Sequence, residues 1–369
     1  MADVRLTMRW PWHRMRSSDR LVCSWADQTL TYVLARQQTD GTWAVLKMGD
    51  EQQGTDSLGS FASRLQAGGL KGFGAVFMLR ASQYQFLQID TPAVPPEELR
   101  AAARYQIREM LQSHVDDVTI DVVRVGDAAH QGSNGHSFVV AAPNVVVRAE
   151  LDMAAAINCP VSVIDVQEMA QRNLQSVLAQ RDGQPERANA ALVLVPGQQA
   201  LLTICVNDEL FYTRRFDVPE GFLSSVWGQG VAVLAPVDGF TPVEEYMPTY
   251  GAGDVSFAED FAPEQPAPIE SSGSSRADDE RAQRLVVEVQ RSLDVWDRTW
   301  SSLPLSQFRV YAGERSAELA QWLTQQLGLA VAPLEVGALF VGFEDAPATQ
   351  QALCLPLLGV FLRAEGNKS

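Results

Sequence analysis

The sequence predicts an α/β protein made of two halves that begin alike. Apolar segments of strand length alternate with helical segments between residues 21 and 179, the pattern of α/β proteins. A polar stretch at 181–188 then marks a boundary, and a second set of strands follows at 190–195, 199–206 and 209–216. Because each set opens with strands around a polar turn, the sequence indicates an internal duplication.

The first half is expected to span residues 21–180. Residues 21–36 and 42–48 should pair as a hairpin, with Thr39, Asp40 and Gly41 as its turn. Further strands are expected at 74–79, 83–89, 118–125, 137–142 and 161–165, and helices at 58–66, 97–112, 145–156 and 167–179.

The second half is expected to span residues 189–340. Its long helix, 281–301, carries an apolar stripe that should face the core: Leu285, Val289, Leu293, Trp296 and Trp300. A strand at 308–312, a helix at 316–326 and an edge strand at 331–333 follow. The last segment, 341–369, should return to the first half through an apolar helix at 352–363.

An acidic insertion is expected at residues 238–280. Its composition, rich in Pro, Gly, Ser, Asp and Glu, buries too little apolar surface to offset the entropy of ordering, so it should be disordered. It is either a solvated spacer or a recruitment segment for a basic partner. The first 20 residues, with arginines around Trp10 and Trp12, form a tail that either contacts an anionic membrane or packs on the body.

Composition and charge exclude several classes of function. A net charge of −16 and a pI near 4.7 argue against nucleic acid as the main partner. The cysteines Cys23, Cys159, Cys205 and Cys354 lack zinc-site spacing and should be buried free thiols. No segment has the length of a membrane span or the form of a signal peptide, so a cytoplasmic location is expected.

Residues 94–123 form the most informative stretch, an amphipathic helix that leads directly into a strand. Pro95 and Pro96 occur where a helix tolerates proline, and Glu97 and Glu98 add negative charge at the positive end of the helix dipole. This arrangement resembles the small inserted subdomain of the MshI/PilM family of type IV (MSHA-type) pilus biogenesis proteins. Further segments that resemble this family occur at 207–214, 288–294 and 355–363, and the resemblance extends from about residue 10 to residue 363.

The resemblance implies an actin-like ATPase fold: two ribonuclease H-like halves with a small α/β subdomain inserted in the first, here about 94–142. It also implies a cytoplasmic protein, peripheral at the inner membrane, that binds the cytoplasmic N-terminal segment of a PilN-like bitopic protein. The inserted subdomain would border the peptide groove. We therefore expect partner contacts from its helix, through Leu99, Arg104, Ile107, Arg108 and Leu111.

The nucleotide site that such a fold would carry is degenerate in this sequence. Phosphate hairpins need an aspartate for magnesium and glycines that let amides approach the phosphates. The first hairpin reads Ser24-Trp25-Ala26-Asp27 instead, and the second places Gly197 after Pro196, without an aspartate. The adenosine turn offers only Gly313.

The preferred hypothesis is therefore a non-enzymatic scaffold of the pilus assembly platform, without cofactor or metal. One alternative is an ATP-binding protein or ATPase of the same machine, which would bind Mg-ATP. Another is a component of type II secretion similar to the cytoplasmic part of GspL. A sugar or acetate kinase relative is disfavoured, since no aspartate occurs in a glycine-rich context.

Overall fold

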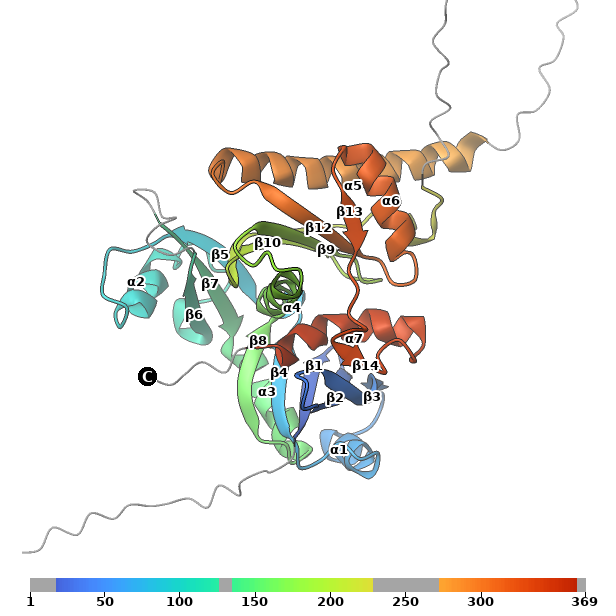
Figure 1. The fold of residues 1–369 in the computed structure, drawn as a ribbon. Coiled ribbons are helices and arrows are strands. Elements are labelled where there is room, and N and C mark those ends of the chain that lie inside the picture. Colours follow the sequence, from blue (N-terminus) through green and yellow to red (C-terminus); the bar gives the residue numbers. More distant parts are fainter. Residues whose placement is uncertain (1–17, 126–134, 228–271, 364–369) are drawn as a thin grey trace, which may run out of the picture.

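The computed structural model describes residues 18–125, 135–227 and 272–363 (Figure 1). The predicted N-terminal tail as far as residue 17, and the predicted acidic insertion as far as residue 271, lie outside these residues. Residues 272–280, which were assigned to that disordered insertion, belong instead to helix α5 (Ser272–Thr299).

The first half is built on a six-stranded sheet in the order β14-β3-β2-β1-β4-β8. Its strands are β1 (Asp19–Ala26), β2 (Thr29–Gln37), β3 (Trp43–Gln52), β4 (Gly74–Leu79), β8 (Val161–Val166) and β14 (Phe340–Val341). β1, β2 and β3 are antiparallel neighbours, whereas β4 and β8 continue the sheet in parallel. β8 is an edge strand.

The second half repeats this topology in a five-stranded sheet ordered β11-β10-β9-β12-β13. The strands are β9 (Ala188–Val193), β10 (Ala200–Val206), β11 (Glu209–Phe216), β12 (Leu305–Tyr311) and β13 (Val331–Pro333). In both halves the third strand is followed across the sheet by the second, first, fourth and fifth. The internal duplication indicated by the sequence is therefore present in the topology.

The first hairpin differs from its prediction, because residues 21–36 form two strands rather than one. The chain reverses at Asp27 and Gln28, whose φ angles of 51° and 57° place both in the left-handed region. Asn207 and Asp208 make the same kind of turn, with φ angles of 49° and 62°. The latter turn was predictable because asparagine and aspartate adopt this region most readily, whereas glutamine seldom does.

The inserted subdomain has its own three-stranded sheet, ordered β5-β7-β6. The strands are β5 (Gln85–Asp90), β6 (Val118–Arg124) and β7 (His136–Pro143). This sheet starts at Gln85, before the expected boundary at residue 94. Its helix α2 (Leu99–Gln106) is shorter than the expected 97–112, because the chain continues as turns after Gln106. A short 3₁₀ turn, η2 (Val115–Asp117), leads into β6.

Two helices, α4 (Gln167–Arg181) and α7 (Ala348–Phe361), lie between the two large sheets (Figure 1). α7 covers β1, β2 and β3, while α4 packs on β9, β10 and β11. They approach closely at Gly359, where a Cβ would lie 1.8 Å from the carbonyl oxygen of Ala170. The C-terminal helix thus returns to the first half.

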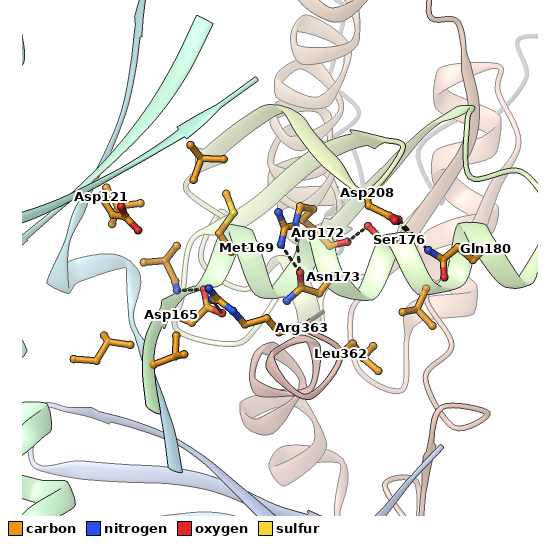
Figure 2. Close-up of a pocket in the computed structure, with 16 residues that line it drawn as sticks. Asp121, Asp165, Met169, Arg172, Asn173, Ser176, Gln180, Asp208, Leu362 and Arg363 are labelled. Atoms are coloured by element: carbon orange, nitrogen blue, oxygen red, sulfur yellow. Dashed lines mark hydrogen bonds and ion pairs between the residues drawn. The ribbon is translucent and has the colours of Figure 1, made fainter. Parts of the chain in front are cut away.

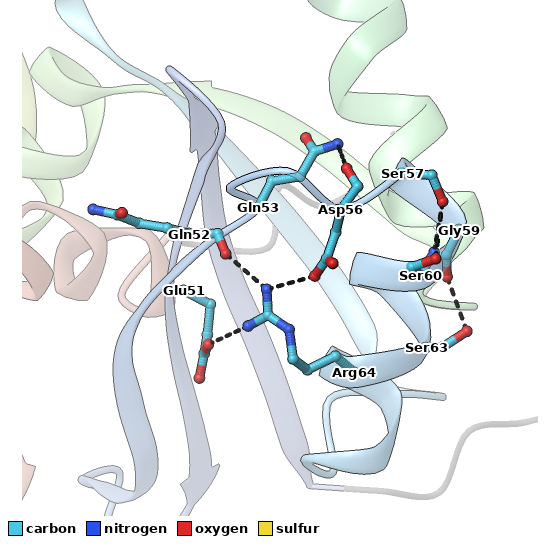
Figure 3. A network of polar contacts seen from close by, with 9 residues as sticks. All are labelled: Glu51, Gln52, Gln53, Asp56, Ser57, Gly59, Ser60, Ser63 and Arg64. Carbon is cyan, nitrogen blue, oxygen red and sulfur yellow. Dashed lines mark hydrogen bonds and ion pairs between the residues drawn. The ribbon is translucent and has the colours of Figure 1, made fainter.

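Other helices cover the outer faces of the sheets. These are α1 (Leu58–Ala67), α3 (Asn144–Ala156), α5 and α6 (Ser316–Leu327). Ser57 caps α1, and Arg64 on that helix bonds Glu51, the Gln52 carbonyl and Asp56, which fastens α1 to the end of β3 (Figure 3). On α5, four of the five residues of the predicted stripe are buried, namely Leu285, Val289, Leu293 and Trp296, while Trp300 follows the helix and is half-buried against the same core. All four cysteines are buried and unpaired, as predicted.

Candidate functional site

The cleft between the halves, where the sequence-based hypothesis places the nucleotide site, contains a small cavity among the described residues. Its volume is about 20 Å³, room for roughly one water molecule, whereas small-molecule sites usually measure about 300–1,000 Å³. Both halves line it, together with α4 and α7: Ser24, Thr31, Met78, Arg80, Gln167, Gln198, Leu353, Pro356 and Leu357. The apolar side chains of α7 and the guanidinium of Arg80 thus occupy the cleft.

The structure does not gather the predicted nucleotide residues around one space. Ser24 lines the cleft cavity, but Asp27 is exposed in its turn and is not part of the lining. Gly197 lines an open pocket of about 610 Å³ beside the loop that follows β11, and this pocket shares Gln198 with the lining of the cleft cavity. Gly313 has a φ of 61° in the turn before α6 and lies in neither lining.

The turn at Gly313 is fastened to the segment that follows β11. Arg315 donates hydrogen bonds of 2.6 and 2.7 Å to the carbonyls of Leu223, in the 3₁₀ turn η3 (Phe222–Ser224), and of Ser225. Its guanidinium also lies 3.7 Å from the centre of the Trp227 ring. Trp227 in turn stacks on Phe222 at 5.1 Å and is 7% exposed. Protein side chains therefore cover this turn.

A buried polar cluster ties the two halves together. Arg215 on β11 donates to Glu168 on α4 at 2.9 Å and to the hydroxyl of Tyr84 at 2.7 Å. Tyr84, next to the 3₁₀ turn η1 (Ala81–Gln83) of the first half, donates to the other oxygen of Glu168. Burial and the Glu168 carboxylate raise the pKa of Tyr84, which keeps its phenol protonated as a donor. Because Glu168 is 1% exposed, this contact crosses the cleft away from solvent.

A much larger groove lies where the inserted subdomain meets the first half (Figure 2). Its volume is about 590 Å³, within the range of binding sites. It is bounded by β6 and β7 of the insertion, the edge strand β8, α4 and the end of α7. Its apolar lining comprises Val123, Val140, Val163, Ile164, Val166, Met169, Val177 and Leu362, and its polar lining comprises Asp121, Asp165, Arg172, Asn173, Ser176, Gln180, Asp208 and Arg363.

Some of the polar side chains in this groove form ion pairs or hydrogen bonds with one another. Arg363 pairs with Asp165 at 2.9 Å, and Asp165 also accepts from the amide of Val166 at 2.8 Å (Figure 2). Arg172 bonds Asn173 at 2.7 Å, and among the described residues it has no carboxylate partner. The groove thus combines an apolar floor with charges of both signs.

The predicted partner residues lie outside the groove lining. Leu99 and Ile107 are buried in the core of the inserted subdomain, and Leu111 packs against that core. Arg104 donates to the Val115 carbonyl and to Asp116, while Arg108 is exposed. The apolar stripe of α2 therefore faces its own sheet, so Leu99 and Ile107 are unavailable to a partner in this arrangement. Sequence reasoning missed the groove because its walls come from segments more than 200 residues apart.

Comparisons with solved structures identify the fold. A chain of the PilM–PilN type IV pilus biogenesis complex superposes with a TM-score of 0.60 at 15% identity, covering 94% of this chain and 99% of that one. The chain has an actin-like fold. This confirms the predicted fold class: two related halves with a small α/β subdomain inserted in the first.

Two other solved structures are more distant. The cytoplasmic domain of EpsL, an inner-membrane component of the Vibrio cholerae type II secretion system, gives a TM-score of 0.38 at 16% identity over 58% of this chain and 79% of that one. A Bacteroides thetaiotaomicron protein of unknown function, described as having an actin-like ATPase fold, gives 0.41 at 8% identity over 92% and 96%. No family model and no curated protein matches the sequence. Within the three described ranges, none of the helices has the length and hydropathy of a membrane span.

Proposed function

We propose that this protein is a PilM-like scaffold of a type IV pilus assembly platform, and that it binds the cytoplasmic segment of a PilN-like inner-membrane protein. The observation that carries the proposal is the 590 Å³ groove beside the inserted subdomain, in a fold shared along 94% of the chain with a component of the PilM–PilN complex. The assignment to an MSHA-type pilus rests on the sequence segments that resemble the MshI/PilM family.

The free edge of β8 suits an extended peptide. Among the described residues, β8 pairs only with β4, and residues 163–166 of β8 line the groove. A bound peptide strand can form main-chain hydrogen bonds with the unpaired amides and carbonyls of such an edge. Pockets beside the edge then bind every second side chain of the peptide and give specificity. The half-buried valines and Met169 would receive apolar side chains of the peptide.

The charge of the protein also favours a basic peptide in the groove. The groove lining holds Asp121, Asp165 and Asp208 together with Arg172 and Arg363, and the chain carries a net charge of −16. Juxtamembrane segments on the cytoplasmic side tend to be basic, so the field of the protein favours their approach. A peptide bound in this way would hold the protein at the inner membrane without a span of its own.

The small cleft cavity supports a role without nucleotide hydrolysis. A nucleotide would require displacement of α7 side chains and opening of the Tyr84–Glu168–Arg215 cluster. We therefore propose a binding protein rather than an ATPase.

Two charge-introducing variants on the inserted subdomain test the site. Val123→Glu places a carboxylate in the groove, and Arg108→Glu alters the exposed turn that follows α2, where the sequence predicted partner contacts. Fluorescence anisotropy with a labelled N-terminal peptide of the PilN-like protein measures the affinity of each. We expect at least a tenfold loss for Val123→Glu, about 1.4 kcal/mol, and a smaller change for Arg108→Glu.

The reverse order of effects would assign the peptide to α2 and remove the groove from the proposal. Absence of peptide binding by the wild-type protein would contradict the function itself. Circular dichroism of both variants establishes that the subdomain stays folded.

A further inference from the structure

The cleft cavity contains a cation without a counter-ion. Arg80 donates to the hydroxyls of Thr31 at 2.9 Å and of Ser24 at 3.4 Å. Both hydroxyls are neutral, and among the described residues no carboxylate forms an ion pair with this guanidinium. Arg80 is half-buried, and partial burial of a charge is costly unless the charge is compensated, so this arginine at the cleft requires an explanation.

Nearby carboxylates do not compensate this charge directly. Glu150 is fully buried, and burial raises its pKa to about 8, so it is mostly protonated at neutral pH. Asp27 and Asp50 are exposed to solvent, which screens their effect on Arg80. Burial correspondingly lowers the pKa of Arg80.

The rest of the cavity wall supplies donors. The side-chain oxygen of Gln167 accepts from Arg215, which leaves its amide nitrogen available. Gln198, from the second half, lines the same cavity, and its side chain has no bond to a described residue. Because Ser24 and Thr31 accept from Arg80, their hydroxyl hydrogens remain free to point elsewhere. No aspartate or glutamate of the described residues lines the cavity.

We propose that this cavity is a binding site for a small monatomic anion of the chloride class. A volume of about 20 Å³ accepts a particle near the size of water and excludes a nucleotide in the closed arrangement. The anion would neutralise Arg80 of the first half and accept from Gln167 on α4 and Gln198 of the second half. It therefore bridges the two halves and stabilises the closed cleft, independently of the peptide groove.

Thermal unfolding of the full chain at constant ionic strength tests the site, with sodium chloride replacing sodium gluconate, an anion too large for the cavity. A ligand that binds only the folded state raises the midpoint in a saturable manner, by roughly 2–5 °C when chloride is in tenfold excess over its Kd. Arg80→Gln should abolish the chloride-dependent shift. Arg298→Gln, on the exposed side of α5, serves as the matched control and should retain the full shift.

Gln198→Glu gives a second test that survives if Arg80→Gln fails to fold. Its carboxylate would pair with Arg80 in place of the anion, so the midpoint in gluconate should rise to the chloride level and the chloride dependence should vanish. Equal midpoints of the wild-type protein in the two salts would overturn the proposal. So would a chloride shift that persists in Gln198→Glu, or stabilisation through Arg80 by inorganic phosphate but not by chloride.

Discussion

The closed cleft and the open groove lie on opposite sides of α4 and differ in how the protein fills them. In the cleft, α7 side chains, Arg80 and the Tyr84–Glu168–Arg215 cluster leave about 20 Å³. In the groove, an unpaired strand edge and half-buried apolar side chains surround about 590 Å³. The same fold thus combines a cleft cavity of about the size of one water molecule with a much larger groove at its insertion.

The comparison teaches that the fold alone does not locate the function. The topology places a cleft between the halves, but the residues that line it decide whether a ligand enters. Here those residues favour a fixed arrangement of the halves, and the available surface lies beside the inserted subdomain.

Of the variants at the cleft, Gly359→Ala should cause the largest loss of stability. The added Cβ would lie 1.8 Å from the Ala170 carbonyl oxygen, so α4 and α7 must separate. We expect a loss of about 4 kcal/mol or more in the free energy of unfolding, measured by urea denaturation. Gly59→Ala is the matched control: it has open space around the new Cβ in α1 and should be neutral or stabilising by up to about 1 kcal/mol. A mild effect of Gly359→Ala would show that the junction is adaptable.

Arg215→Met should rank next, because it leaves the Glu168 carboxylate buried without its partner. Removing one member of a buried pair costs about 3–5 kcal/mol. Arg100→Met breaks an exposed pair with Asp121 and should cost no more than about 1 kcal/mol. Similar losses in the two denaturation curves would contradict the view that the cluster clamps the halves.

Glu150→Gln should have an effect that is small at pH 5 and grows as the pH rises. Glu150 accepts from Gln83 at 3.2 Å, and its other oxygen has no partner among the described residues. Folding raises its pKa from 4.5 to about 8, so the folded state binds this proton more tightly. Stability is therefore lost as the pH rises from about 4.5 to 8, by at most about 1.4 kcal/mol per pH unit, and the loss levels off above 8.

The Gln variant should remove that slope and gain stability relative to the wild-type protein at pH 8. Denaturation curves at pH 5, 6.5 and 8 measure it, with Glu186→Gln as the exposed control. Parallel pH dependence of wild type and Glu150→Gln would show that Glu150 does not titrate in this range.

Sequence reasoning reached the fold through local signals and the order of elements. Residues close together in the sequence determine three of these elements: the Asn207–Asp208 turn, the stripe of α5 and the closing helix α7. The Asp27–Gln28 turn escaped prediction because glutamine is unusual at a positive φ. The similar φ angles of the two turns show that topology can impose a conformation against residue preference.

The groove could not be predicted in the same way. Its walls join Val123, Val163, Met169 and Leu362 from four elements, and no local pattern marks such a meeting. The stripe of α2 did not point to the groove, because one apolar face can serve either a partner or the core, and here Ile107 is fully buried in the core. The sequence predicted a degenerate nucleotide site, whereas the small volume of the cleft cavity could be found only from the structure.

Isothermal titration calorimetry of the full chain tests the central claim most directly. The chain is titrated with Mg-ATP and, separately, with the cytoplasmic peptide of the PilN-like protein. Our account predicts saturable heat with the peptide and none with Mg-ATP. Saturable binding of Mg-ATP at micromolar concentration would contradict it, because the cleft would then open for the nucleotide that its side chains exclude in the present structure.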